Sequence, residues 1–136
     1  MQSTQWSYLD TLAGPDIAAI LQEWRKHQPG IGVFALVCEQ EREAVALLQE
    51  IAAAEAMPLV GAIVPGLIAE AKFWRKGVLL VAFDATISRQ IVPLPHTGNY
   101  TADATVAVFA DFVATHAEEN GGDPLLLLVD ATNPDG

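Results

Sequence analysis

The amino-acid sequence predicts an α/β domain built on a mixed β-sheet, with a βαβ unit, an antiparallel meander and about three helices. Two observations support this fold class. Short apolar runs rich in Val, Ile and Leu alternate with stretches in which apolar residues recur every three or four positions, as on one face of a helix. Turn signals built from Pro, Gly and Asn separate these segments. The 136 residues suffice for one domain with a buried core.

The first half of the chain has the pattern of a βαβ unit. A helix begins at Pro15, because proline favours the first helical position, and it ends before Pro29. Residues 31–38 form an apolar run typical of a strand that is buried on both faces. A helix over about residues 40–56 follows, and then a second apolar strand over residues 59–64. Two such strands around one helix favour parallel pairing.

The second half of the chain predicts further strands and one helix. Three consecutive segments are predicted to form the antiparallel meander: residues 67–74, 77–84 and 87–92. Residues 75–77, Arg-Lys-Gly, are predicted to make the first hairpin turn. The stretch PLPHTGNYT, residues 93–101, has the composition of a loop. A helix over about residues 102–119 and a buried strand over residues 124–130 complete the pattern.

One domain is predicted, covering residues 15–136, with an N-terminal segment before it. Residues 1–14 are mostly polar and carry the isolated aromatic residues Trp6 and Tyr8. We expect this segment to pack loosely, or only against a partner. No repeat, low-complexity tract or linker divides the remainder of the sequence.

Charge and hydrophobicity restrict the class of partner. The formal net charge is −10, so repulsion from phosphate argues against nucleic acid and anionic membranes. Hydrophobic residues make up 51% of the chain and charged residues only 18%. Such a chain has little charge to cover its apolar surface, which favours a partner. That partner is expected to be a second copy, in a homo-oligomer, or the C-terminal remainder of a larger protein.

The predicted location is the cytoplasm. Cys38 is the single cysteine, so no internal disulfide can form, and a reducing compartment fits. The N-terminus has neither the basic start nor the apolar stretch of a signal peptide. The apolar runs are shorter than the ~20 residues that cross a bilayer.

His96 is the one candidate ligand for haem or a metal ion. It lies in the loop over residues 93–101, and loops carry function more often than element interiors do. A lone histidine without a second ligand at motif spacing is more often an ordinary solvated loop residue. His27 and His116 fall in the last turns of predicted helices, where they interact with the helix dipole.

The other chemistry-bearing residues favour structural explanations. Cys38, at the end of a strand, is typical of a small buried hydrophobe. Asp84 and Asp130 each end a strand; paired carboxylates can hold Mg²⁺, but aspartate also simply begins turns. The sequence contains no nucleotide-binding, hydrolase or zinc-protease motif, so no enzyme is predicted. Three aromatic residues could stack on a small ligand or belong to the core: Phe73, Trp74 and Tyr100.

Four short motifs together resemble the N-terminal half of the FIST sensory domain. They are Leu59-Val60-Gly61, Gly66-Leu67-Ile68, the apolar strand at 77–83 and the Leu-rich strand that ends in Asp130. The resemblance covers about residues 30–130. It rests mostly on apolar residues and glycine, which specify a fold more than a chemistry.

The resemblance implies a non-enzymatic, intracellular module for signal transduction that binds a small ligand such as an amino acid. It places the ligand near the Pro65-Gly66 turn and the loop over residues 93–101. Where the family has small polar residues before the glycine, this chain has Ile63-Val64-Pro65. Polar contacts to a ligand would therefore come from elsewhere. The candidate ligand-binding residues are Gly61, Pro65, Gly66, His96 and Tyr100.

Two alternatives to ligand sensing follow from the same sequence. The chain could be a structural half-domain that homodimerises through exposed strands without any ligand, as its high hydrophobic fraction suggests. It could also be a haem-based gas sensor with His96 as the ligand, because a subgroup of the family resembles haem proteins that sense nitric oxide. In the leading hypothesis no cofactor is required.

Overall fold

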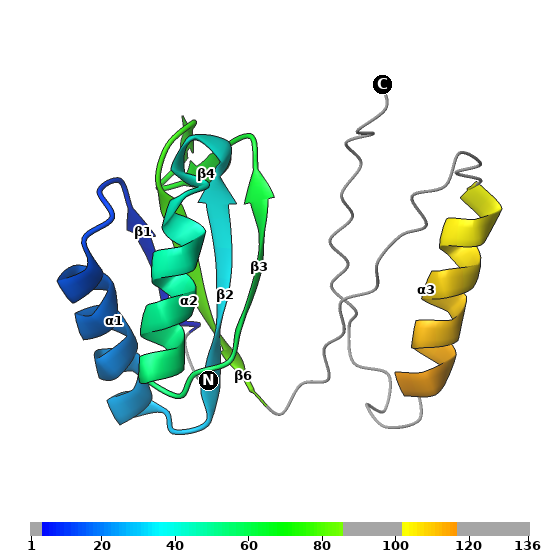
Figure 1. Ribbon diagram of the computed structural model, residues 1–136, viewed down its shortest axis with the longest axis horizontal. Helices are drawn as coiled ribbons and strands as arrows, with labels where there is room; N and C mark the ends of the chain where they lie inside the picture. Colours follow the sequence, from blue (N-terminus) through cyan, green and yellow to red (C-terminus); the bar gives the residue numbers. More distant parts are fainter. Residues whose placement is uncertain (1–3, 86–101, 117–136) are drawn as a thin grey trace. The chain divides into compact units, whose positions relative to one another are not determined.

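The computed structural model describes residues 4–85 and 102–116, and it confirms an α/β fold with a mixed sheet (Figure 1). The chain divides into two compact units, Met1–Ile87 and Ser88–Gly136, and each is described by itself. Helix α3 (Ala102–His116) belongs to the second unit and begins where the sequence predicts. The other described elements belong to the first unit. Within the described ranges, no helix has both the length and the apolar character needed to cross a membrane.

Four strands of the first unit form one sheet, in the order β1-β6-β2-β3. β2 is parallel to β3 and antiparallel to β6, which in turn is antiparallel to β1. Because helix α2 (Ala44–Ala54) connects β2 to β3, the predicted βαβ unit is confirmed. The bounds of the strands are β1 (Trp6–Leu9), β2 (Ile31–Cys38), β3 (Leu59–Val64) and β6 (Val78–Asp84).

The second helix is shorter than the predicted range of 40–56. The chain leaves β2 through a single 3₁₀ turn, η1 (Glu39–Glu41), and α2 begins only at Ala44. Such tight turns are common as connectors where a chain must reverse direction. At the other end, Ala56 adopts a positive φ of 52°, the left-handed conformation that commonly follows a helix.

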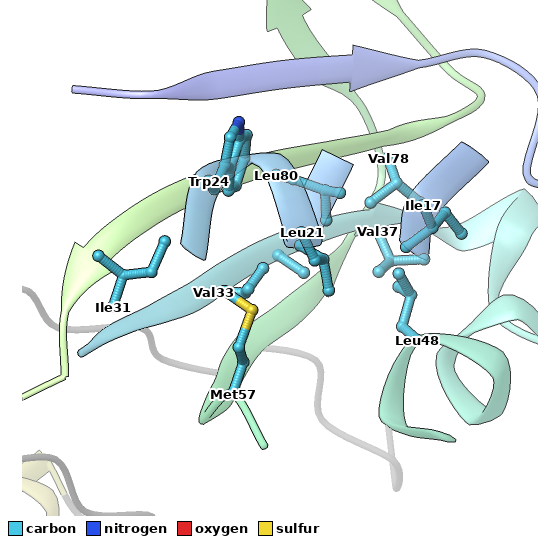
Figure 2. Packing of buried hydrophobic residues seen from close by; sticks show 11 residues of the cluster. Ile17, Leu21, Trp24, Ile31, Val33, Val37, Leu48, Met57, Val78 and Leu80 are labelled. Carbon is cyan, nitrogen blue, oxygen red and sulfur yellow. The ribbon is translucent and has the colours of Figure 1, made fainter. Parts of the chain in front are cut away.

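The core lies between the sheet and two helices on the same face, α1 (Gly14–His27) and α2 (Figures 1 and 2). Every second residue of β2 enters this core: Ile31, Val33, Ala35 and Val37. They pack with the apolar face of α1, of which Ile17 is fully buried and Leu21 is 2% exposed. Each such side chain contributes roughly 1.5–3 kcal/mol when it leaves water. The helices thus need the sheet, and the sheet needs the helices, to bury their apolar faces.

Polar contacts join the C-terminal ends of the two helices. Glu55, just after α2, pairs with Arg25 at 3.1 Å and accepts a hydrogen bond from the Gln22 amide at 2.7 Å. Arg25 also donates to the backbone carbonyl of Glu55 at 2.6 Å. His27 lies in the last turn of α1, as predicted, with Nδ1 2.9 Å from the Glu23 carbonyl oxygen. These contacts set the relative position of two helices that otherwise touch through apolar side chains.

The predicted meander has the wrong strand pairing. Residues 67–74 form two short strands, β4 (Leu67–Ala69) and β5 (Lys72–Trp74), which pair with each other in a separate antiparallel sheet. Glu70 and Ala71 make the turn between them with φ of 53° and 59°. Two consecutive positive φ values are typical of a type I′ hairpin turn, which Asn-Gly usually announces in a sequence. Glu-Ala carries no such signal.

β6 pairs with β2 and β1, and not with β5. The reason is its apolar character on both faces, which suits a strand inside a sheet better than the end of a meander. Residues 75–77 therefore connect two different sheets and are not a hairpin turn between paired strands. The remaining predicted segments of the second half, residues 87–92, 93–101 and 124–130, lie outside the described residues.

The N-terminal segment contributes an edge strand to the sheet. Residues 6–9 form β1, which pairs with β6 from Trp6↔Val81 to Leu9↔Val78. Part of the segment is therefore integral to the fold of the first unit. The four residues of β1 are the lower limit of a run that indicates a strand in a sequence, and mostly polar residues precede them.

Replacing Ala71 by glycine is expected to stabilise the first unit by about 0.5–1 kcal/mol. Glycine adopts a φ of 59° freely, whereas an L side chain costs roughly 1–2 kcal/mol there. Urea unfolding followed by circular dichroism measures the change. Ala53→Gly is the matched control, because Ala53 lies within α2, where glycine destabilises by about 0.5–1 kcal/mol. A loss of stability in Ala71→Gly would contradict the left-handed turn.

Candidate functional site

The carboxyl ends of β2 and β3 lie side by side at one edge of the sheet. The two strands are parallel, and their last residues, Cys38 and Val64, are register partners. η1 follows β2 directly, and Pro65-Gly66 follows β3. Ligands of open α/β sheets bind outside the carboxyl ends of the strands. This edge is therefore the first place to look for a binding site.

The β4–β5 hairpin folds back over the same edge. Pairing of Leu67 with Trp74 brings the neighbouring Phe73 beside Gly66. A Cβ on Gly66 would overlap the Phe73 ring, so only glycine allows the ring to lie there. An open depression of about 430 Å³ results, and its lining comes from the ends of β2, β3 and β5: Glu39, Gln40, Pro65, Phe73 and Arg75.

Opposite charges stand on the rim of this depression. Arg75 makes no hydrogen bond or ion pair with any described residue. Glu39 is held at 3.6 Å by Arg42, and both side chains are about two-thirds exposed, so this pair is weak and water-screened. Gln40 adds an amide, and Phe73 adds an aromatic face that is 63% exposed. The depression thus offers a cation with no partner among the described residues, an anion, an amide and an apolar surface.

A pair of stacked aromatic rings holds the hairpin on the sheet. The rings of Tyr8, on β1, and Trp74, on β5, have centroids 5.0 Å apart. The Trp74 indole donates to the Ala69 carbonyl at 3.1 Å, and the Tyr8 hydroxyl donates to the Lys76 carbonyl at 3.0 Å. The backbone N–H of Cys38 donates to the Gly77 carbonyl at 3.0 Å, beyond the end of β5. These contacts fix Phe73 and Arg75, which flank Trp74, relative to the edge of the sheet.

Cys38 is a buried structural residue at the base of this region. Its side chain is fully buried, and its Sγ lies 3.9 Å from the Trp74 carbonyl oxygen. Burial raises the pKa of the Cys38 thiol, and the nearby Glu41 carboxylate raises it further. A raised pKa keeps the thiol protonated and weakly nucleophilic. The prediction that Cys38 is a small hydrophobe is confirmed.

The predicted ligand-binding residues do not all lie at the depression. Pro65 lines it and Gly66 stands beside Phe73. Gly61 instead lies within β3, opposite Ala35, where it serves strand packing. His96 and Tyr100 lie outside the described residues.

Sequence reasoning missed all three polar residues of the lining: Glu39, Gln40 and Arg75. Glu39 and Gln40 follow β2 immediately, and the rule that places ligands at the carboxyl edge of a parallel pair could have found them. Arg75 was assigned to a hairpin turn, so its place beside Phe73 became visible only once β5 was seen to pair with β4. Within the described ranges, no group of three or more His, Cys, Asp or Glu side chains could hold a metal ion.

Comparisons with known proteins returned no relatives. No protein-family model matches the chain, and no curated protein and no solved structure matches it. The resemblance to the FIST sensory domain therefore rests on the sequence motifs alone, and it stays a prediction.

Gly61→Ala is expected to lower the free energy of unfolding by about 1–3 kcal/mol. A Cβ at this position overlaps the carbonyl of Ala35 on the paired strand, so β2 and β3 would have to move apart. Urea unfolding measures the change. Gly14→Ala is the control, because its Cβ would meet Leu47 and Ile51 at ordinary contact distances of 3.6 and 3.7 Å. Equal stability of the two variants would contradict the close approach of β3 to β2.

Stability is expected to fall in alkaline solution because of Cys38. In the unfolded chain the thiol ionises near pH 9, whereas the folded protein retains the proton to higher pH. The contribution of the protonated Cys38 thiol to stability is therefore fully present below that pH, and it is lost as the pH rises through the pKa of the folded state. Chemical unfolding between pH 7 and 10.5 should show a shallower fall in Cys38→Ala than in the wild type. Parallel pH profiles would contradict the raised pKa.

Proposed function

We propose that this chain is a non-enzymatic, intracellular sensory module resembling the FIST domains, and that it binds a free amino acid in the depression beside Pro65. One observation carries the proposal. An unpaired guanidinium, a carboxylate and an aromatic ring converge at the carboxyl edge of the βαβ unit, among the described residues. These three groups match the three parts of an amino acid with an apolar side chain.

Arg75 supports recognition of the α-carboxylate. A guanidinium presents its N–H donors as a planar fork that matches a carboxylate with two parallel hydrogen bonds. No described acidic residue forms an ion pair with Arg75, so a ligand need not displace an internal partner. Arg75 also follows Trp74, whose ring is held in place, so the backbone that carries the guanidinium is positioned in advance.

Glu39 supports recognition of the α-ammonium group, and Gln40 can accept or donate a further hydrogen bond. The exposed face of Phe73 offers contact to an apolar or aromatic ligand side chain. Because the lining groups are exposed to water, their charges are partly screened, and modest affinity is expected. These groups also supply the polar contacts that Ile63-Val64-Pro65 does not.

The β4–β5 hairpin can pass the effect of ligand binding on to the sheet. Arg75 and Phe73 belong to the β5 region, whereas Glu39 and Pro65 follow β2 and β3. A ligand that contacts both sides would therefore hold the hairpin against the sheet more firmly. Only such differential contact allows a ligand to shift a conformational equilibrium.

A thermal-shift screen against the proteinogenic amino acids tests the proposal on the full chain. A ligand at a hundredfold excess over its Kd stabilises the folded state by about 2.7 kcal/mol, which raises the Tm by several degrees. For any amino acid that raises the Tm, the corresponding primary amine, which lacks the α-carboxylate, should leave the Tm unchanged. If no amino acid raises the Tm at saturating dose, ligand sensing by this chain is wrong.

Arg75→Gln is expected to weaken binding of the amino acid about tenfold or more, because a hydrogen bond to a charged group is worth about 1.5–3 kcal/mol. Isothermal titration calorimetry measures the Kd. Lys76→Gln is the matched control: it removes the same charge one residue along, and Lys76 contributes its backbone carbonyl, not its ammonium, to the contact with Tyr8. Equal weakening in both variants would show a general charge effect and would contradict the assigned role of Arg75.

A further inference from the structure

The outer edge of β1 is unpaired among the described residues. β1 is the first strand in the sheet order, and its described neighbour is β6 alone. The backbone N–H of Ala82 donates to the Gln5 carbonyl at 2.8 Å, so the polar groups of Gln5 point towards β6. Because these groups alternate in direction along an antiparallel strand, the N–H and C=O groups of Trp6 and Tyr8 point away from the sheet. They are free to pair with another strand.

Apart from its short length of four residues, β1 has none of the features that protect an edge strand. Natural edge strands usually carry lysine, proline or a bulge that prevents further pairing. Residues 4–9, TQWSYL, contain no charge, no proline and no glycine. β1 pairs with β6 in unbroken register, so no bulge twists it away.

Apolar surface adjoins the free edge. Trp6 is 52% exposed and Ile68 is 76% exposed. Both line a shallow depression of about 250 Å³ that β1, β6 and the hairpin share, together with Leu79 and Val81. These exposed apolar side chains lie where a strand added to the edge of β1 would contact them.

We propose that two copies of this chain pair through β1, antiparallel about Ser7, so that their sheets join into one. This register places Trp6 opposite the partner's Tyr8, and the partner's Trp6 opposite Tyr8. The free backbone groups of both residues then form two reciprocal hydrogen-bonded pairs, as a twofold axis requires. Directly opposite aromatic residues stabilise such strand pairs. Tyr8 already stacks on Trp74, so the partner's Trp6 would extend a row of rings.

The charges of β1 do not oppose a second copy as the occupant, and the symmetry of the Trp6 and Tyr8 positions about Ser7 suits one. Each chain carries a net charge of −10, so most surfaces of two copies repel each other. The register about Ser7 is an exception, because residues 4–9 are uncharged and Asp10 falls opposite the partner's Thr4. No two acidic residues within residues 4–10 are brought face to face.

The first experiment measures the oligomeric state of the full chain by size-exclusion chromatography with light scattering. The wild type should elute at twice the chain mass of 14.5 kDa. Trp6→Lys adds a charge at the edge and removes an aromatic anchor, and it should raise the dimer Kd about tenfold or more. Ala53→Lys is the control, because it adds the same charge on α2, and it should remain dimeric. A monomeric wild type, or a Trp6→Lys variant that stays dimeric, would overturn the proposal.

The second experiment tests the register itself and does not depend on the loss of a large side chain. In the proposed pairing Ser7 lies opposite the partner's Ser7 as a non-hydrogen-bonded pair, with Cα atoms about 4.5 Å apart, a separation that a disulfide can bridge. Ser7→Cys should therefore cross-link into a dimer under mild oxidation. Thr4→Cys, two residues before β1, falls opposite the partner's Asp10 in this register and should not. Both variants carry Cys38→Ala to remove the native thiol. Failure of Ser7→Cys to cross-link, or preferential cross-linking of Thr4→Cys, would exclude this register.

Discussion

The parallel pairing of β2 with β3 is the constraint on which the rest of the first unit depends. It brings the two strand ends to one edge of the sheet, where η1 and Pro65-Gly66 follow. The pairing is close: Gly61 approaches the Ala35 backbone so nearly that no side chain fits there. The same strand β2 pairs with β6 on its other side, and its alternate residues enter the core beneath both helices. The core and the candidate site therefore share one strand.

The β4–β5 hairpin brings to the candidate site a charged side chain that β3 and the turn after it lack. Ile63, Val64 and Pro65 offer no polar side chain to a ligand. The type I′ turn at Glu70 and Ala71 folds the chain back, so that Phe73 and Arg75 lie at the same edge of the sheet as Pro65. The turn uses two non-glycine residues with positive φ, an arrangement that costs free energy and persists only where the surrounding structure holds it. That support comes from the stacking of Trp74 on Tyr8 and from the hydrogen bond of the Trp74 indole to Ala69.

Sequence patterns predict those parts of the fold that local periodicity determines. The apolar face of α1, the run of β2 and the βαβ order all follow from side-chain spacing and turn residues, and the structure confirms them. The strand pairing of β6 could not be predicted from the sequence, because the apolar composition of a strand indicates that it is buried but not which strands pair with it. The hairpin was missed because Glu70-Ala71 lacks the Asn or Gly that normally marks a positive φ.

The candidate site was predicted only in part, for a related reason. Pro65 and Gly66 were visible as a break between apolar runs. Arg75 and Glu39 are separated by 36 positions in the sequence, and only the strand pairings bring them to the same edge. Residues that gather by topology leave no local pattern. Motifs of apolar residues and glycine could therefore indicate where a site lies without indicating its chemistry.

Tyr8 connects the two surfaces for which functions are proposed. It belongs to β1, the edge proposed to pair with a second copy, and its ring stacks on Trp74, which lies between Phe73 and Arg75. A ligand that holds the hairpin more firmly also holds this ring and the strand that carries it. Thermodynamic linkage then makes any effect reciprocal: if the ligand strengthens dimer formation by some factor, dimer formation strengthens ligand binding by the same factor. The proposed sensory role requires such a connection between the ligand site and the surface that a second copy contacts, and the stacked rings of Tyr8 and Trp74 are placed to provide it.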